Sequence, residues 1–201
     1  PLMSRPAYVE IAHLPLPERV KRLRDPQVKA RILSAERVGE PGWGSMVDNP
    51  AIYARLFPMG DPPDYEPTAD QSLAAIAARE NRTPEELLYE HMLRDEGREL
   101  LLLPFFNYSD GDLEPFREML DSEQTVLSLG DGGAHCGIIC DASFPTYLLT
   151  HWTRDRKRGE KLSIPFVVAA QSRRTALAFG LQDRGVIAPG FASTWPRSTS
   201  S

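Results

Sequence analysis

Cysteine is scarce in this sequence, which holds only Cys136 and Cys140. Two cysteines cannot build the disulfide framework of a small secreted protein, so we expect a reducing, cytoplasmic setting. Long apolar runs are missing as well. The longest, residues 100–106, falls far short of the roughly 18 residues that a membrane span requires. We therefore expect no membrane partner and no targeting leader, although a start at Pro1 instead of Met suggests an excised or processed piece.

A strong excess of charge of one sign is also missing. The 28 acidic and 23 basic residues give a formal net charge of −5, and 41% of the 201 residues are hydrophobic. That composition excludes disordered and fibrous classes and favours one globular domain. Nucleic-acid-binding surfaces are usually basic, so we expect no nucleic-acid partner. The densest basic cluster is expected to form a solvated face of a helix; it consists of Arg154, Arg156, Lys157 and Arg158.

Proline is abundant, with 18 residues that cut the chain into short elements. Apolar residues at helical spacing predict helices over residues 16–38, interrupted at Pro26. A second helical region is predicted over residues 71–92. Within it, Thr83 followed three positions later by Glu86 is typical of a capped helix start.

A strand, a helix and a second strand are predicted in the middle of the chain. Residues 99–106 contain the apolar run at 100–106 and are typical of a strand buried on both faces. Residues 112–120 follow as a helix with Asp112 as its cap, and residues 125–129 form another short apolar run. The order predicts a βαβ unit with parallel strands.

In such units the chemistry lies after the carboxyl ends of the strands. After the second strand, Asp131 lies among glycines, where its carboxylate can bind a metal ion or accept a proton from water. It can equally cap the glycine-rich turn. His135 can be a ligand, a general acid or a structural loop histidine, and these alternatives stay open.

Three further sites are weaker interpretations of the same stretch. A His–Cys nucleophilic pair is disfavoured because adjacent residues in a strand-like stretch point to opposite sides. A phosphate-binding glycine loop is disfavoured because no Lys-Ser/Thr follows the glycines. A zinc site would need ligands from two well-separated segments, whereas the candidates cluster; they are Asp131, His135, Cys136, Cys140, Asp141 and His151.

Three blocks of sequence carry a family resemblance. They are GDGGAH at residues 130–135, CDASFPTYLLTHW at 140–152 and DRGVIAPG at 183–190. Together they resemble the C-terminal part of the metal-dependent amidohydrolase superfamily, in its N-acyl-D-amino-acid deacylase-like branch. The resemblance runs from about residue 6 to residue 192.

The resemblance implies a (β/α)8 barrel, the TIM barrel, whose strand ends hold one or two divalent metals, usually zinc. Residues 125–129 would be strand eight and residues 99–106 strand seven. The implied fold class is α/β: a helix-rich partial TIM barrel that carries the last barrel strands and their helices. It would occupy residues 1–190, and residues 191–201 would be a disordered or truncated tail.

The resemblance also assigns roles to single residues. Asp131 matches the strand-eight aspartate, which is a metal ligand and the catalytic residue that activates water and passes its proton to the leaving nitrogen. His135 and Asn107 are the implied substrate-binding residues. The implied substrate is a small molecule with an N-acyl or other amide bond.

The sequence departs from the family pattern in two respects. None of its four histidines forms the His-x-His pair of the family, and residues 132–151 lack the arginine with which such deacylases bind a substrate carboxylate. A catalytic zinc needs three protein ligands. We therefore expect that the isolated chain neither retains zinc nor hydrolyses amides by itself.

Two other functions remain open. Two strands are too few to close a barrel, and helices over residues 71–92 and 144–181 would cover only part of them. A non-catalytic partial-barrel module is therefore the main alternative, as a homo-oligomer or completing a partner chain. The third is a small complete enzyme that uses Asp131, His135 and Asp141.

Overall fold

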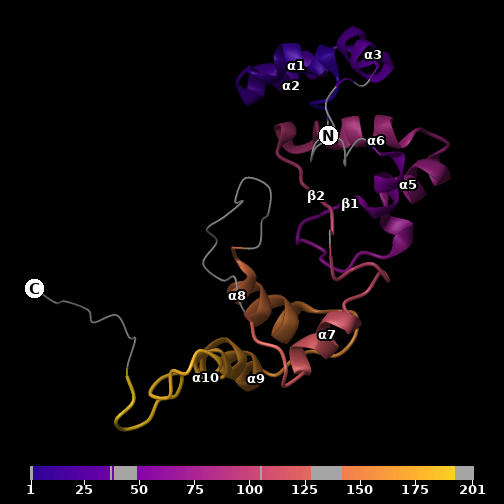
Figure 1. Ribbon diagram of the computed structural model, residues 1–201. Helices are drawn as coiled ribbons and strands as arrows, with labels where there is room; N and C mark the ends of the chain where they lie inside the picture. Colours follow the sequence, from indigo (N-terminus) through magenta and orange to yellow (C-terminus); the bar gives the residue numbers. More distant parts are fainter. Residues whose placement is uncertain (1, 37, 39–48, 105, 128–141, 193–201) are drawn as a thin grey trace, which may run out of the picture. The chain divides into compact units, whose positions relative to one another are not determined.

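The computed structural model describes residues 2–36, 38, 49–104, 106–127 and 142–192. The chain divides into two compact units, unit 1 (Pro1–Asp112) and unit 2 (Leu113–Ser201). Helices dominate both units (Figure 1). None of the helices in the described ranges is long and apolar enough to cross a bilayer.

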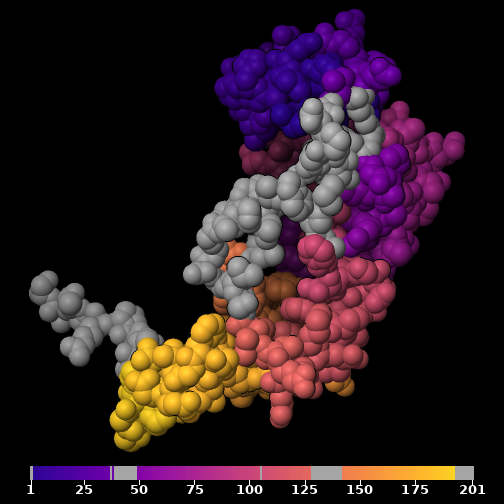
Figure 2. Space-filling model, in the orientation of Figure 1, coloured from indigo at the N-terminus to yellow at the C-terminus, as the bar shows by residue number. Residues whose placement is uncertain are grey.

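Unit 1 begins with three short helices, each with proline in its first turn. They are α1 (Pro6–Ala12), α2 (Leu16–Leu23) and α3 (Pro26–Ser34). Proline suits this position because the first amides of a helix have no acceptor within it. Asp25 caps α3 by accepting a 2.8 Å hydrogen bond from the amide of Gln27. The predicted helices interrupted at Pro26 are confirmed, and the atoms of α1 to α3 form one continuous block in Figure 2.

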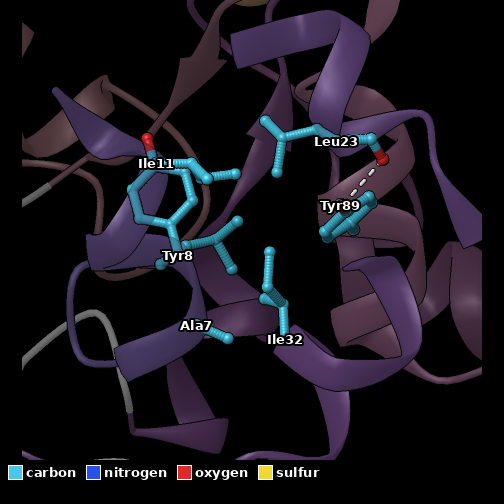
Figure 3. Packing of buried hydrophobic residues seen from close by; sticks show 7 residues of the cluster. Ala7, Tyr8, Ile11, Leu23, Ile32 and Tyr89 are labelled. Atoms are coloured by element: carbon cyan, nitrogen blue, oxygen red, sulfur yellow. Dashed lines mark hydrogen bonds between the residues drawn. The ribbon is translucent and has the colours of Figure 1, made fainter. Parts of the chain in front are cut away.

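The first apolar core of unit 1 lies between these helices and α6 (Pro84–His91) (Figure 3). The hydroxyl of Tyr89, on α6, donates a 2.8 Å hydrogen bond to the carbonyl of Leu23, on α2. Burial raises the pKa of the Tyr89 phenol to about 12. The core residues are Leu2, Ala7, Tyr8, Ile11, Leu23, Ile32 and Tyr89.

The second part of unit 1 packs around another apolar core. Its elements are η1 (Pro50–Arg55), β1 (Phe57–Pro58), η2 (Ala69–Gln71), α5 (Leu73–Glu80), α6, η3 (Arg94–Gly97) and β2 (Leu101–Leu102). Its buried residues are Tyr53, Leu56, Leu73, Ala77, Leu87 and Leu88. The predicted start of α6 is confirmed, because Thr83 and Glu86 exchange backbone-to-side-chain hydrogen bonds of 3.3 Å.

The strand predicted over residues 99–106 is corrected by the structure. Only Leu101–Leu102 form β2, which pairs antiparallel with β1. The expectation of burial on both faces is wrong, since Leu100 is 63% and Phe106 81% exposed. Prolines limit the ladder, because Pro58 ends β1 and Pro104 follows β2, and proline cannot donate to a ladder.

The second strand, predicted over residues 125–129, is not found in the part of that range that the structure describes. Residues 125–127 have no regular secondary structure, and residues 128 and 129 lie outside the described ranges. No parallel strand pair occurs among the described residues, whose sheet has two antiparallel strands. What the structure shows is a helix-rich chain with a small sheet.

The regular elements in the described part of unit 2 are helices. They are α7 (Glu114–Asp121), α8 (Phe144–Tyr147), which continues into the π-helical η4 (Leu148–Asp155), and α9 (Ile164–Ala169), which continues through the π-helical η5 (Ala170–Arg174) into α10 (Thr175–Ala178). The prediction that Asp112 caps α7 is wrong. The helix begins at Glu114, so Leu113 occupies the cap position and supplies no side-chain hydrogen bond.

Arg156 corrects the prediction of a solvated basic face. Arg154 and Lys157 are exposed, but Arg156 is only 2% exposed. Its guanidinium lies 4.4 Å from the ring centroid of Trp152 and donates to Glu114 Oε1 at 2.7 Å. It also donates to the carbonyl oxygen of Glu160 at 2.7 Å. These acceptors and the aromatic face replace the water that a buried guanidinium loses.

Candidate functional site

Most of the predicted site lies outside the described residues. Asp131 and His135 fall in residues 128–141. So do the other members of the weaker zinc hypothesis apart from His151, namely Cys136, Cys140 and Asp141. The described part of the candidate site therefore consists of Asn107, His151 and the two chain segments that lead into and out of residues 128–141.

Asn107 is an exposed residue of unit 1, in the loop after β2. Its backbone adopts a left-handed conformation with φ of 61°, which asparagine tolerates better than most residues. The next residue, Tyr108, is buried and donates a 2.7 Å hydrogen bond to the carbonyl of Pro67. The local backbone thus gives a structural reason for asparagine here, and its predicted contact with substrate stays a prediction.

The segment that leads into residues 128–141 is bound to the helix formed by η5 and α10. The guanidinium of Arg174 donates to the carbonyl of Ser122 at 2.5 Å and lies 3.4 Å from those of Leu120 and Thr125. Thr175 Oγ1 lies 3.4 Å from the carbonyl oxygen of Leu127 and 3.0 Å from that of Ala170, so its single proton is shared. The end of α7 and the residues after it are thereby fixed in place.

The segment that leaves residues 128–141 is bound to the same helix. The side-chain amide of Gln171, in η5, donates a 2.9 Å hydrogen bond to the carbonyl of Pro145, in the first turn of α8. A void of only about 10 Å³ remains beside the entering segment, where Ala170 and Arg174 face Leu127 and its neighbours. Both flanks of the predicted site therefore meet one helix.

His151 lies one turn after Tyr147 in the helix formed by α8 and η4. Its ring stacks on that of Tyr147 at 4.8 Å between centroids, with 5° between the ring planes. The ring of Trp152 is perpendicular to it at 6.0 Å. The indole nitrogen of Trp152 is buried and has no hydrogen-bond partner among the described residues. His151 is thus a packed aromatic residue of unit 2.

His91 is buried in unit 1 at the end of α6. Its Nε2 lies 3.2 Å from the carbonyl oxygen of Leu100 and therefore carries a proton and donates it. Burial lowers the pKa of His91, and the nearby Arg94 lowers it further, while the Leu100 carbonyl and Glu99 oppose the change. A neutral imidazole whose Nε2 is used in this way has only Nδ1 left for a metal.

The described residues do not fit a catalytic zinc ion. Nowhere in the described ranges do three or more His, Cys, Asp or Glu side chains gather as a metal-binding group would require. A catalytic zinc needs three protein ligands and an open position. A depression of about 320 Å³ in unit 1 is lined by Arg5, Leu33, Thr83, Glu85 and Glu86, none of which the sequence analysis selected as a site residue.

Sequence reasoning missed Gln171 and Arg174. The only signal in the sequence is a pair of arginines, Arg173 and Arg174, after the apolar stretch 164–170. That pattern is usual for a solvated helix face, so it could not reveal that Arg174 binds main-chain carbonyls some 50 residues earlier in the chain.

Comparison with known proteins identifies a family. The sequence model described as "Amidohydrolase family" matches residues 10–192. No curated protein and no solved structure matches the chain. The match covers both units and includes residues 128–141.

Proposed function

Because this chain belongs to the amidohydrolase family, we propose that it supplies part of the active site of a hydrolase that cleaves amide or related C–N bonds, with Asp131 as its catalytic carboxylate. The observation that carries the proposal is the family match over residues 10–192, which includes Asp131 and the glycines around it. The proposed substrate class is a small molecule with an N-acyl or other amide bond, as in the deacylase-like branch, and the proposed setting is the cytoplasm.

The proposed role of Asp131 is proton transfer. One carboxylate oxygen accepts a proton from the attacking water as the new C–O bond forms. The same oxygen then gives that proton to the nitrogen as the C–N bond breaks, so the carboxylate ends the cycle as it began. His135 and Asn107 are proposed to bind the substrate.

The family typically uses divalent metals, and the described residues provide no three-ligand site for one. We propose that the remaining ligands come from another polypeptide, either a second copy or a complementary chain. Large apolar side chains on the surface support a requirement for such a chain, because they favour a covering protein surface. Among the described residues, Phe106 is 81%, Phe179 73% and Ile187 88% exposed.

Hydrolysis assays at several protein concentrations test the proposal. The purified chain is incubated with Zn²⁺, Co²⁺ or Mn²⁺ and a panel of N-acyl-D- and N-acyl-L-amino acids, and the released amine is measured. If a second copy completes the site, specific activity rises with protein concentration in parallel with the oligomer fraction from light scattering.

Two variants make the assay specific. Asp131→Asn removes the charge with little change of shape and is expected to abolish hydrolysis. Glu123→Gln is the matched control, since Glu123 is an exposed carboxylate of the same unit, and its activity is expected to equal that of the wild type. Equal hydrolysis by Asp131→Asn and wild type would contradict the proposed role.

The same exposed apolar residues favour a second candidate function, a non-catalytic module that completes a partner protein. This candidate predicts no hydrolysis at any concentration with any metal, together with a stable oligomer. A rise of specific activity with concentration therefore identifies a hydrolase that a second copy completes, and a stable oligomer without activity identifies this module.

A further inference from the structure

A closed loop over residues 182–192 follows α10 and is the yellow segment after that helix in Figure 1. The amide of Ala192 donates a 2.7 Å hydrogen bond to the carbonyl of Asp183. Within the loop, the amide of Phe191 donates to the carbonyl of Ala188 at 3.1 Å. The last residue of the loop is therefore joined to its beginning, and the segment between them projects from a closed base.

Arg173, in η5, holds the 182–192 loop against the helix. Its guanidinium donates to the carbonyls of Gln182 and Arg184, both at 2.9 Å, and lies 5.4 Å from the ring centroid of Phe191. Gly185 comes so close to η5 that an added Cβ would lie 2.7 Å from the Cα of Arg173. The base of the loop is thus fixed by polar contacts and by a close backbone approach.

The tip of the 182–192 loop is apolar and faces solvent. Val186 is 46% and Ile187 88% exposed. None of the loop residues, all of which the structure describes, is buried. Compact loops of this length are usually packed by their own side chains, because apolar area in water is unfavourable. Here polar contacts hold the loop, and the two apolar side chains at its tip are left for another surface to cover.

The charges beside the tip favour one kind of partner. Residues 185–190 contain no charged side chain, and the chain as a whole carries −5. Next to them, Asp183 and Arg184 form an exposed ion pair at 3.0 Å. A nucleic acid or an anionic membrane gains little attraction from such a surface. A second copy brings the same apolar tip and both charges, so a two-fold arrangement can place Asp183 of each copy near Arg184 of the other.

We propose that the 182–192 loop is a docking element through which two copies of this chain associate, with Val186 and Ile187 of one copy against those of the other. The loop is held in shape before it binds, so little conformational entropy is lost on association. The inference rests on the proposed function only in naming the second polypeptide that would complete the active site. The contacts that shape the loop do not depend on that function.

Two matched pairs of substitutions test the tip. Ile187→Ser and Val186→Ser remove its apolar side chains. Ile164→Ser and Val168→Ser are the controls, because these residues of α9 are 60% and 49% exposed. Analytical ultracentrifugation gives the dimer dissociation constant of each variant, and urea midpoints show that each is folded. We expect the dissociation constant to rise about tenfold or more in Ile187→Ser, about threefold or more in Val186→Ser, and less than about twofold in both controls.

Arg173→Met tests whether the shape of the loop matters. The variant removes the contacts at the base and leaves the tip side chains in place, so we expect a rise of the dissociation constant of about fivefold or more. Arg154→Met is the control, since Arg154 is exposed in the same unit and pairs with its neighbour Asp155. Equal dissociation constants of Arg173→Met and wild type would contradict a docking element that is held in shape.

Complementary charge variants test whether the partner is a second copy. Arg184→Asp makes the flank of the tip acidic, and Asp183→Arg makes it basic. Each variant alone should dimerise about tenfold more weakly than wild type, and a mixture of the two should recover the affinity to within about threefold. Association is followed by the fluorescence anisotropy of one labelled variant. A mixture as weak as the separate variants would contradict a two-fold pairing of these loops.

A wild type that stays monomeric at its highest soluble concentration would overturn the inference, as would equal weakening by Ile187→Ser and Ile164→Ser. Sedimentation of monomeric wild type with phosphatidylcholine vesicles would identify a membrane as the occupant of the tip and would also overturn it. Hydrolysis decides a separate question. A tip-dependent dimer without hydrolysis would refute the proposed function and leave the inference intact, whereas hydrolysis that rises with concentration equally in Ile187→Ser would refute the inference alone.

Discussion

At the scale of single residues, Arg156 shows how a remote contact overrides a local pattern. The sequence places it in a basic cluster that predicts exposure, yet the side chain is buried against Trp152 and paired with Glu114, 42 positions away. Nothing within the cluster distinguishes Arg156 from Arg154. Its burial depends on a carboxylate that only the fold brings near.

Removal of the Arg156 guanidinium tests its contribution to stability. Arg156→Met should lower the free energy of unfolding by about 2 kcal/mol, because charge-assisted hydrogen bonds and a cation–π contact are lost. Arg154→Met is the control, since Arg154 is exposed and pairs with its neighbour Asp155; its effect should stay below about 0.5 kcal/mol. Urea unfolding measures both, and equal effects would contradict the argument.

Gly159 completes the surroundings of Arg156. Its φ is +75°, and an added Cβ would lie 2.0 Å from Glu114 Oε1 and 2.8 Å from a guanidinium nitrogen of Arg156. Gly180 has a similar φ of +74° with open space around it. Both Gly→Ala variants incur the left-handed backbone strain of about 1 kcal/mol. We expect Gly159→Ala to lower the urea midpoint distinctly more than Gly180→Ala does. Equal midpoints would show that the ion pair of Arg156 can move aside without loss of stability.

At the scale of elements, helices could be predicted from the sequence because their signals are local. Thr83 and Glu86 lie three residues apart and cap α6 by themselves. Strands could not be predicted in the same way, since β2 is defined by its partner β1, which lies about 40 residues earlier. Within the candidate site, the glycines around Asp131 could be recognised from the sequence as a candidate catalytic segment. The contacts of Arg174 could not be predicted, because their acceptors are main-chain carbonyls some 50 residues earlier in the chain.

The contact between α6 and the residues before β2 makes stability depend on pH. Burial lowers the pKa of His91 from its ordinary value of 6.5, so the folded state binds fewer protons than the unfolded state once the pH falls below that value. The contribution of the neutral His91 ring to the free energy of unfolding is therefore present above about pH 6.5. It is lost as the pH falls toward the lowered pKa.

We expect the urea midpoint of the wild type to decrease when the pH is lowered from 7.5 to 5.5. The midpoint of His91→Gln should decrease less. Glutamine can still donate to the Leu100 carbonyl but does not titrate. His13→Gln is the control, because His13 is exposed at the end of α1, and it should keep the wild-type pH dependence. A parallel decline in all three proteins would exclude His91 as the cause.

At the scale of the whole molecule, exposed apolar side chains indicate association. Phe106 in unit 1 and Phe179 and Ile187 in unit 2 are largely exposed. We predict an oligomer at micromolar concentration by light scattering. Phe179→Ser and Ile187→Ser should shift it toward monomer, whereas Met119→Ser, on α7, should not if the surface near α10 is the interface. A monomeric wild type would contradict the prediction.

The boundary at Asp112 and Leu113 also bears on how the protein melts. The boundary lies between residues 99–106 and residues 125–129, the two segments that the sequence predicts to pair as parallel strands. Each unit holds its own buried residues, so heat need not disrupt both together. Scanning calorimetry should then give a calorimetric enthalpy larger than the van't Hoff enthalpy, and Arg156→Met should lower the melting temperature of one component alone. A single transition with equal enthalpies would mean that the two units unfold as one cooperative body.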